Sequence, residues 1–294
     1  MCIQFLSKPN QTQKFNIATT LIRINIRSGN ALAFPTLDPV ARSVIYLIVG
    51  VVLVYSFSRA LKLRPKPITI AKPRKETAAA LIVSVALFIL VFAWRTLTKT
   101  FQLQPPENTV SITFGLWDAF LYGMGFVVII VAMKITRQNI GSIGINRKDT
   151  GKMLFLGFAI SAILLAIYGL LTISLGGGFV GFSYFLAYDL ILSIIVGFSE
   201  EIFWRGYIQT RLIAYSGTIK GLVVTSLLFA VLWHFPIAYY VETSGVVLEA
   251  LAWALLRFPI GLLLGYIMVK SQNIIPSSII HLFIDWNLVL WLIP

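Results

Sequence analysis

The chain has 294 residues, of which 58% are hydrophobic and only 12% are charged, and its mean hydropathy is +0.87. A soluble globular domain carries about twice this share of charged residues. The composition therefore excludes an ordinary soluble domain and indicates a protein that lies largely within a membrane. The net charge of +13 would also suit a nucleic-acid-binding protein, so the placement of the charges has to decide between these interpretations.

Apolar runs long enough to cross a bilayer as helices, about 20 residues each, recur along the whole chain. The runs are continuously apolar rather than alternating, which excludes the strands of a β-barrel. We therefore predict an all-α membrane protein, a polytopic bundle of about eight transmembrane helices. Residues 1–40 are expected to form an N-terminal tail, 41–183 the N-terminal transmembrane helices, and 184–294 a C-terminal core. The predicted spans are 41–57, 77–94, 112–133, 153–175, 184–213, 221–241, 246–269 and 274–293.

The basic residues gather in two connections of this predicted bundle. Seven lie between the first and second spans and five between the third and fourth, whereas the connections after the fourth and sixth spans contain none. Basic connections of transmembrane helices remain in the cytoplasm. We therefore expect a multi-pass protein of the plasma membrane whose cytoplasmic loops contact anionic lipid headgroups, and we do not expect nucleic acid as a partner.

The fifth predicted span, 184–213, contains the stretch FSEEIFWRG at 198–206. This span is too long for one straight crossing and is expected to tilt or to run on into the interface. Glu201 and Arg205 are four residues apart, so they share a helical face and can form an ion pair. On its own, such a pair fits a structural role better than a catalytic one. Glu200 is rotated by about 100° from Glu201 and is free to face something else.

Both histidines of the chain lie inside predicted spans, His234 in the sixth and His281 in the eighth. Counted from the cytosolic ends of their spans, Glu200 and His234 each lie 14 residues deep and His281 lies 7 residues deep, with Asp285 one turn deeper. At about 1.5 Å per residue, these groups fall within two or three helical turns of one another. Ionisable groups within a membrane are costly, so their convergence from three helices predicts a functional site. Asp189 lies on nearly the same helical face as Glu200 and could line the same cleft.

Three motifs carry these residues in order along the late spans: EEIFWR at 200–205, FAVLWH ending at His234, and HLFID at 281–285. Together they resemble the signature motifs of the CPBP intramembrane proteases. That family includes the type II CAAX prenyl endopeptidases and the bacteriocin-processing or immunity (Abi) proteins. The resemblance covers about residues 184–294, and the first four spans carry no motif of the family.

Two positions depart from the pattern of the family. Its second motif is usually FxxxH, but Ala230 stands four residues before His234 here, and Phe229 stands five residues before it. The prenyl endopeptidases usually have Asn at the position of Asp285, which leaves the specificity for CAAX substrates open.

The resemblance implies that Glu200 and His234 activate a water that attacks a peptide carbonyl, while His281 and Asp285 stabilise the oxyanion. Asp285 would do so either as a protonated acid or by fixing the tautomer and charge of His281. Glu201 and Arg205 are then expected to support the site by holding their helix in register.

We therefore expect an intramembrane endopeptidase that acts on a membrane-associated or prenylated peptide from a cavity open toward the cytosol. No cofactor is expected. Zinc is the alternative, with His234, His281 and Asp285 as its three protein ligands.

Two other functions remain open from the sequence. One is a catalytically silent immunity or binding protein on the same scaffold. The other is a transporter that uses the carboxylates as a proton relay. The chain shows no inverted repeat of the kind that transporters have, and the complete set of polar groups argues against a silent scaffold.

Overall fold

The computed structural model describes residues 39–63, 67–101, 112–147, 149–179, 184–242 and 245–292. The tail expected at 1–40 therefore lies almost entirely outside the described residues. The N-terminal elements are α2 (Pro39–Ala60), α3 (Pro73–Thr100), α4 (Ile112–Ile135), the 3₁₀ turn η1 (Ile140–Ile143), α5 (Thr150–Ser174) and β1 (Gly178–Phe179). The C-terminal elements are α6 (Tyr184–Glu201), η2 (Ile202–Gln209), α7 (Thr210–Ser216), α8 (Thr218–Leu228), η3 (Phe229–His234), α9 (Phe235–Ile237), η4 (Ala238–Glu242), α10 (Val247–Leu255), α11 (Phe258–Ser271), α12 (Ile274–Leu290) and β2 (Trp291–Leu292).

Five helical stretches within the described residues are long and apolar enough to cross a membrane: Ala41–Ala60, Pro73–Thr100, Thr150–Ser174, Thr218–Tyr240 and Val247–Ser271. Two further apolar helices, Phe120–Ile135 and Ile274–Trp286, are shorter. The structure thus confirms an all-α polytopic membrane protein. The third and eighth predicted spans correspond to α4, which has 24 residues, and α12, which has 17. The fifth changes its helix type along its length.

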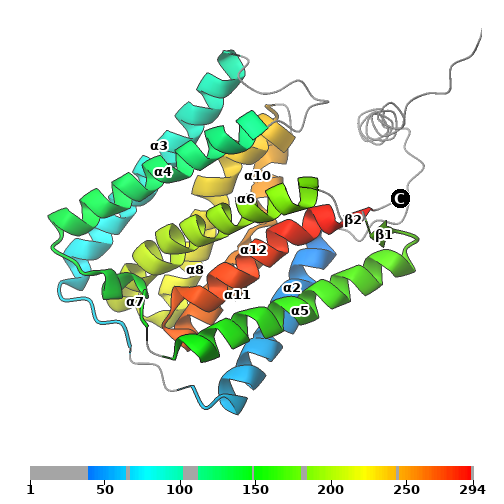
Figure 1. Cartoon of the computed structure of the whole chain (residues 1–294). Coiled ribbons are helices and arrows are strands. Elements are labelled where there is room, and N and C mark those ends of the chain that lie inside the picture. The colour runs from blue at the N-terminus through cyan, green and yellow to red at the C-terminus, as the bar shows by residue number, and fades with distance from the viewer. Residues whose placement is uncertain are drawn as a thin grey trace, which may run out of the picture.

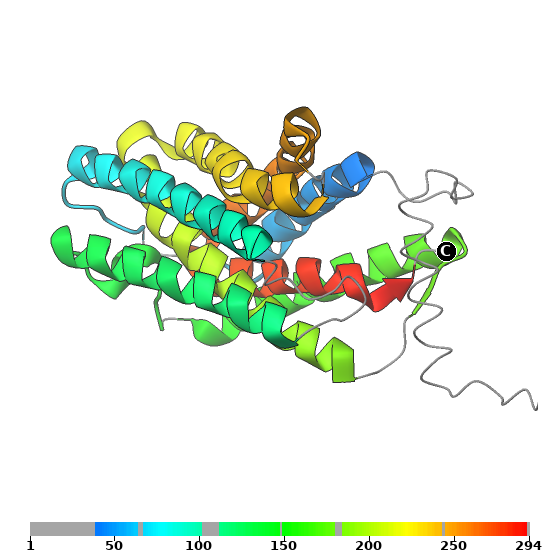
Figure 2. The ribbon, with the colours of Figure 1, turned by 90° about the horizontal axis from the view of Figure 1, so that it is seen from above.

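The helices are arranged in two layers (Figures 1 and 2). One layer contains α4, α6, α12 and α5, in which α12 packs against α6 on one side and α5 on the other. Behind it lie α8, α10, α11 and α2, where α11 packs against both α2 and α8. The C-terminal helices therefore occupy the centre of the molecule, and the N-terminal helices flank them.

The fifth, sixth and seventh predicted spans are irregular helices. The fifth runs from α6 through the π-helix η2 into α7, and the sixth contains the π-helices η3 and η4. In the seventh, α10 ends at Leu255 and α11 begins at Phe258, with Pro259 in its first turn. Proline lacks the backbone N–H that would bond to the preceding turn, which accounts for this break. π-helical turns are frequent at functional sites, and η2 and η3 contain residues of the first two motifs.

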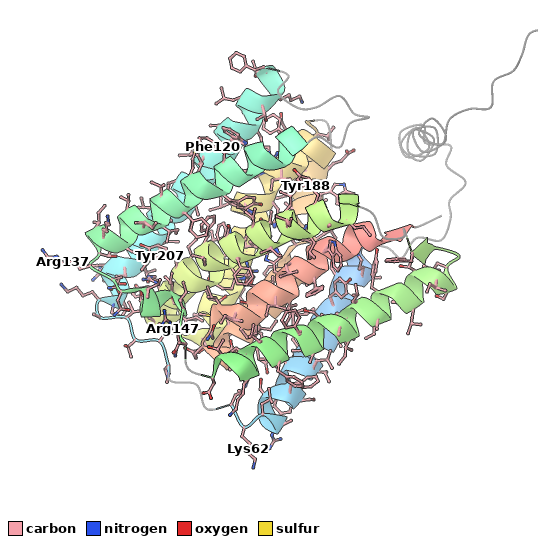
Figure 3. All side chains as sticks on the ribbon, viewed as in Figure 1. Lys62, Phe120, Arg137, Arg147, Tyr188 and Tyr207 are labelled. Atoms are coloured by element: carbon pink, nitrogen blue, oxygen red, sulfur yellow. The ribbon has the colours of Figure 1, made fainter. Side chains whose placement is uncertain are left out.

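Basic residues of the connections after α2 and α4 gather at one end of the bundle. Lys62, Arg137 and Arg147 lie at one end of the helices, whereas Phe120 and Tyr188 lie toward the other (Figure 3). This is the grouping of basic connections that the sequence predicts. The far end also holds a short strand pair that the sequence did not predict, in which Phe179 pairs with Trp291 in antiparallel register.

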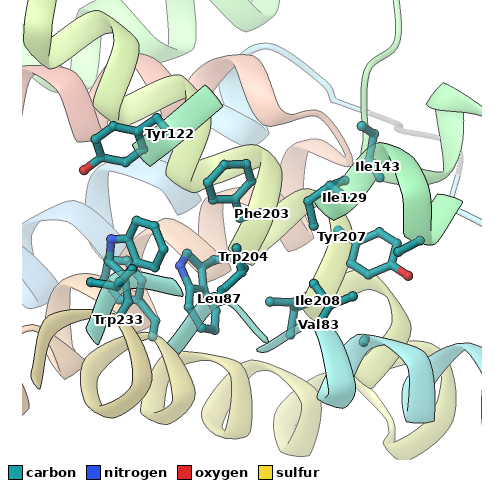
Figure 4. Close-up of a cluster of buried hydrophobic side chains, with 14 of the residues drawn as sticks. Val83, Leu87, Tyr122, Ile129, Ile143, Phe203, Trp204, Tyr207, Ile208 and Trp233 are labelled. Atoms are coloured by element: carbon teal, nitrogen blue, oxygen red, sulfur yellow. The ribbon is translucent and has the colours of Figure 1, made fainter. Parts of the chain in front are cut away.

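The largest buried cluster lies between α3, α4, η2 and η3. At its centre Trp233 contacts both Phe203 and Trp204 edge to face, with ring centroids 5.9 Å and 6.2 Å apart (Figure 4). Edge-to-face aromatic contacts stabilise a packing beyond the area that they bury. Both motif-bearing segments, η2 and η3, are therefore fixed by bulky side chains directly beside their polar residues.

Candidate active site

Glu201 ends α6, and Arg205 lies one turn further on, in η2. Both side chains are buried, and Arg205 Nη1 lies 3.0 Å from Glu201 Oε1. The guanidinium also lies 4.1 Å from the ring centroid of Phe229 and donates from Nη2 to the carbonyl of Gly261 at 3.5 Å. A buried arginine needs such partners because an unpaired charge in the interior is very costly. The ion pair predicted from the sequence is therefore present and links η2 to η3 and α11.

His281 lies on α12 against the same carboxylate. Its Nδ1 is 3.0 Å from Glu201 Oε1. An ionised carboxylate only accepts hydrogen bonds, so Nδ1 carries the proton in this contact. The two helices come this close because α6 has Gly197 here, where a Cβ would lie 2.9 Å from the backbone nitrogen of Leu282. Glu201 therefore joins Arg205 to His281 and fixes the ring orientation.

Asp285 faces His281, as its spacing predicts, but on the other ring nitrogen from Glu201. Its Oδ2 lies 3.5 Å from Nε2 of His281, whereas Nδ1 donates to Glu201. One helical turn brings Asp285 to Nε2, while α6 packs against the Nδ1 side of the ring. Its side chain is 26% exposed, and Asp189 on α6 lies close enough to interact with it electrostatically. The two acids therefore line the more open side of the site.

Glu200 is the residue that the other groups surround. Its Oε2 lies 3.7 Å from Nε2 of His281 and 3.9 Å from Nε2 of His234. These distances exceed direct hydrogen bonds and leave the three groups facing one another around a common point. Glu200 is only 2% exposed, whereas the His234 side chain is 14% exposed. The structure thus brings Glu200, His234, His281 and Asp285 together, with His234 and Asp285 at the accessible edge.

The unusual spacing of the second motif is matched by the helix geometry of η3. A π-helix bonds residue i to residue i+5, so residues five apart share a face. Phe229 and His234 are five apart, and their rings meet edge to face with centroids 4.6 Å apart. The same phenylalanine lies under Arg205 and within 6.1 Å of His281. Phe229 therefore fills the position beside the histidine in spite of the extra residue.

Two contacts of Glu200 could not be foreseen from the motifs. The hydroxyl of Tyr122 on α4 donates to Glu200 Oε1 at 2.9 Å, and the indole of Trp233 lies beside the same carboxylate. The rings of Tyr122 and Trp233 are themselves 5.8 Å apart (Figure 4). Trp233 adjoins His234 in the sequence, so its place near the site could have been predicted. Tyr122 is 78 residues from Glu200 and carries no such signal.

The residues predicted as zinc ligands do not form a metal cluster. Across the residues that the structure describes, no group of three or more His, Cys, Asp and Glu side chains is arranged to hold a metal ion. One nitrogen of His281 is already engaged by Glu201, and only its Nε2 faces Asp285.

Comparison with known proteins agrees with the geometry of the site. Residues 182–287, a little over a third of the chain, match the family model described as type II CAAX prenyl endopeptidase Rce1-like. This segment contains all three motifs and leaves out Tyr122. No curated protein and no solved structure matches the chain. The resemblance indicated by the motifs is thereby confirmed: residues 182–287 match the Rce1-like model of the type II CAAX prenyl endopeptidases.

Proposed function

We propose that the protein is an intramembrane endopeptidase that hydrolyses a peptide bond in a membrane-associated or lipidated, CAAX-like protein or peptide. The observation that carries the proposal is the placement of Glu200 Oε2 within 4 Å of the outer nitrogens of both His234 and His281. The family match supplies the reaction class, since the Rce1-like model describes prenyl endopeptidases.

In the proposed reaction Glu200 is the general base. A water between Glu200 and His234 loses a proton to the carboxylate while its oxygen attacks the carbonyl carbon of the scissile bond. Tyr122 holds the other carboxylate oxygen, so the reactive oxygen keeps its direction. Burial of Glu200 removes competing solvent from the base.

The attack forms a tetrahedral intermediate that carries an oxyanion, and the group that later leaves is an amine. His281 takes part as the imidazolium, which the facing carboxylates of Glu200, Glu201 and Asp285 favour. Its Nδ1–H donates to Glu201, and its Nε2–H, which faces the centre, donates to the oxyanion. The proton taken by Glu200 passes to the leaving amine, with His234 placed to relay it at the exposed edge. Collapse of the tetrahedral intermediate breaks the C–N bond and releases an acid and an amine.

We infer that the substrate reaches this site along the membrane. The catalytic groups lie on helices within the bundle, and their exposed members are His234 and Asp285. In the proposed orientation the basic connections face the cytoplasm, contact anionic lipids and place the opening of the site toward the cytosolic side of the plasma membrane. A lipidated peptide would bring its apolar group into the bilayer and its peptide to the site.

Two other functions compete with this one. A silent immunity or binding protein would not need the Glu200–His234–His281 geometry, and a proton-coupled transporter would need a continuous polar route through the bundle. The three groups instead converge on one point with His234 at its exposed edge, which favours hydrolysis over proton relay.

Cleavage by the protein reconstituted in lipid vesicles tests the proposal. A library of prenylated and unprenylated peptides would be incubated with wild type and with Glu200→Ala, and products would be read by mass spectrometry. We expect cleavage by wild type alone. Equal cleavage by both proteins, or cleavage by neither, would reject the assignment.

Tyr122→Phe tests the positioning of the base. We expect kcat to fall about tenfold with KM unchanged, because the hydroxyl orients Glu200 and does not touch the substrate. Tyr168→Phe is the matched control, since the Tyr168 hydroxyl accepts a hydrogen bond from Arg42, far from the site. Equal kcat values for the two variants would show that the Tyr122 contact has no catalytic part.

Metal analysis of purified, active protein tests the metal-free mechanism. We expect zinc well below one ion per chain and activity that withstands chelators, because Glu200 acts as the base without a Lewis acid. Stoichiometric zinc, with activity lost on chelation and restored by zinc, would instead make His234 and His281 ligands.

A further inference from the structure

One charged residue within the membrane takes no part in the mechanism above. Arg257 lies between α10 and α11, near the middle of the apolar stretch Val247–Ser271. Its side chain is half-buried. Among the residues whose side chains the structure describes (a set that leaves out Glu242), no carboxylate forms an ion pair with it and its side chain makes no hydrogen bond. A charged side chain at this depth is costly and as a rule is either paired or functional.

The helix packing places Arg257 beside His234. Gly261 lies one turn after Arg257, and a Cβ there would be 3.3 Å from the ring of Phe229. α11 and η3 run in opposite directions at this contact. Arg257 lies one turn before Gly261 on α11, and His234 lies one turn after Phe229 on η3, so both residues lie on the same side of the contact. Both α10 and α11 pack against η3. Arg257 is accordingly close enough to the His234 ring to act on it electrostatically.

The charges around the site are unevenly balanced. Arg205 is paired with Glu201, and His281 faces carboxylates at both ring nitrogens. Among the side chains that the structure describes, Arg257 has no such counterpart. Within this set, the positive charge next to His234 is unmatched, and the acids lie on the side next to Asp285.

We propose that Arg257 binds the free carboxylate at the C-terminus of the peptide substrate and so confines cleavage to bonds near that end. This assignment rests on the proposed endopeptidase function. A guanidinium binds a carboxylate through two parallel N–H donors, which gives both charge and direction to the contact.

The proposed reaction puts the right part of the substrate on this side. His234 relays the proton to the leaving amine, so the amino end of the C-terminal fragment lies beside His234. A fragment of two or three extended residues spans about 7–10 Å, which is one or two helical turns. Its terminal carboxylate would then reach Arg257. A lipid phosphate is a poorer occupant, because headgroups lie outside a hydrocarbon core about 30 Å thick and Arg257 lies near mid-span.

Two S-prenylated CAAX peptides that differ only at the C-terminus provide the test, one with a free carboxylate and one with an amide. For wild type in lipid vesicles we expect kcat/KM to be about 10- to 100-fold higher for the acid, the range of a hydrogen bond to a charged group. Arg257→Gln should lower the acid value to that of the amide and leave the two peptides equivalent. Arg257→Lys keeps the positive charge but lacks the two parallel N–H donors of the guanidinium, so it should retain part of the preference for the acid peptide.

Arg59→Gln is the control, because Arg59 is an exposed cation on α2 and should leave the preference intact. Equal turnover of acid and amide by wild type would overturn the assignment, and this comparison does not depend on the folding of any variant. A preference that persists in Arg257→Gln would also overturn it.

An amidated peptide that ends in Asp separates the terminal carboxylate from a side-chain carboxylate. We expect this peptide to be cleaved as poorly as the plain amide, and full restoration would contradict recognition of the terminus. Failure of wild type to cleave any of the three peptides would instead reject the endopeptidase function itself. The two failures are therefore distinguishable.

Discussion

Glu200→Gln is expected to lower kcat by about 10²- to 10⁴-fold while the protein still folds. The amide keeps the shape of the side chain and can still meet the Tyr122 hydroxyl, but it cannot take a proton from water. His281 keeps its contact with Glu201, and the His234 ring keeps its contact with Phe229. The measurement is the turnover of a cleaved peptide by reconstituted protein, together with the melting temperature in detergent.

Glu249→Gln is the matched control, because it makes the same chemical change at an exposed glutamate of α10. Its turnover should equal that of wild type. Near-normal turnover by Glu200→Gln would show that another group is the base. Loss of folding in Glu200→Gln alone would show that the residue is structural.

The helical membrane architecture could be predicted because it depends on average properties of long segments. Apolar runs of about 20 residues and the grouping of basic connections survive local irregularities. The irregularities themselves could not be foreseen. The π-helices η2 and η3 depend on how Phe203, Trp204 and Trp233 pack against neighbouring helices, and the sequence of a single segment does not contain that information.

The members of the candidate site could be predicted better than their contacts. Depth counting and the motifs brought Glu200, His234 and His281 to one level of the membrane, and spacing by four gave the Glu201–Arg205 pair. Spacing by four also placed Asp285 against His281, but it could not give the contact of Glu201 with Nδ1, because rotation of α12 against α6 decides which carboxylate meets which nitrogen. Within-helix periodicity cannot report such a rotation.

Contacts from outside the motif-bearing helices were also beyond the sequence. Tyr122 belongs to α4, and its approach to Glu200 follows from the packing of α4 against α6. The family model begins at residue 182 and does not include it. The N-terminal helices therefore contribute to the site although they carry no recognisable motif.

Arg205→Met is expected to cause the largest loss of stability among the variants considered, about 3–5 kcal/mol. The substitution leaves the Glu201 carboxylate buried without its cation and removes the guanidinium from the ring of Phe229. His281 is then the remaining partner of Glu201. The yield of monodisperse protein and its melting temperature in detergent would measure the effect.

A double variant separates the buried charge from the lost packing. Glu201→Gln combined with Arg205→Met removes both charges, and replacing a whole buried ion pair costs less than breaking it. We expect the double variant to melt above Arg205→Met, while Arg59→Met, at an exposed position, melts as wild type does. A double variant no more stable than Arg205→Met would mean that contacts with Phe229 and Gly261, rather than charge, account for the loss.

Catalysis should not recover in the double variant, because an amide in place of the Glu201 carboxylate no longer offers the Nδ1 proton of His281 a charged acceptor. Stability and activity would then separate in one protein.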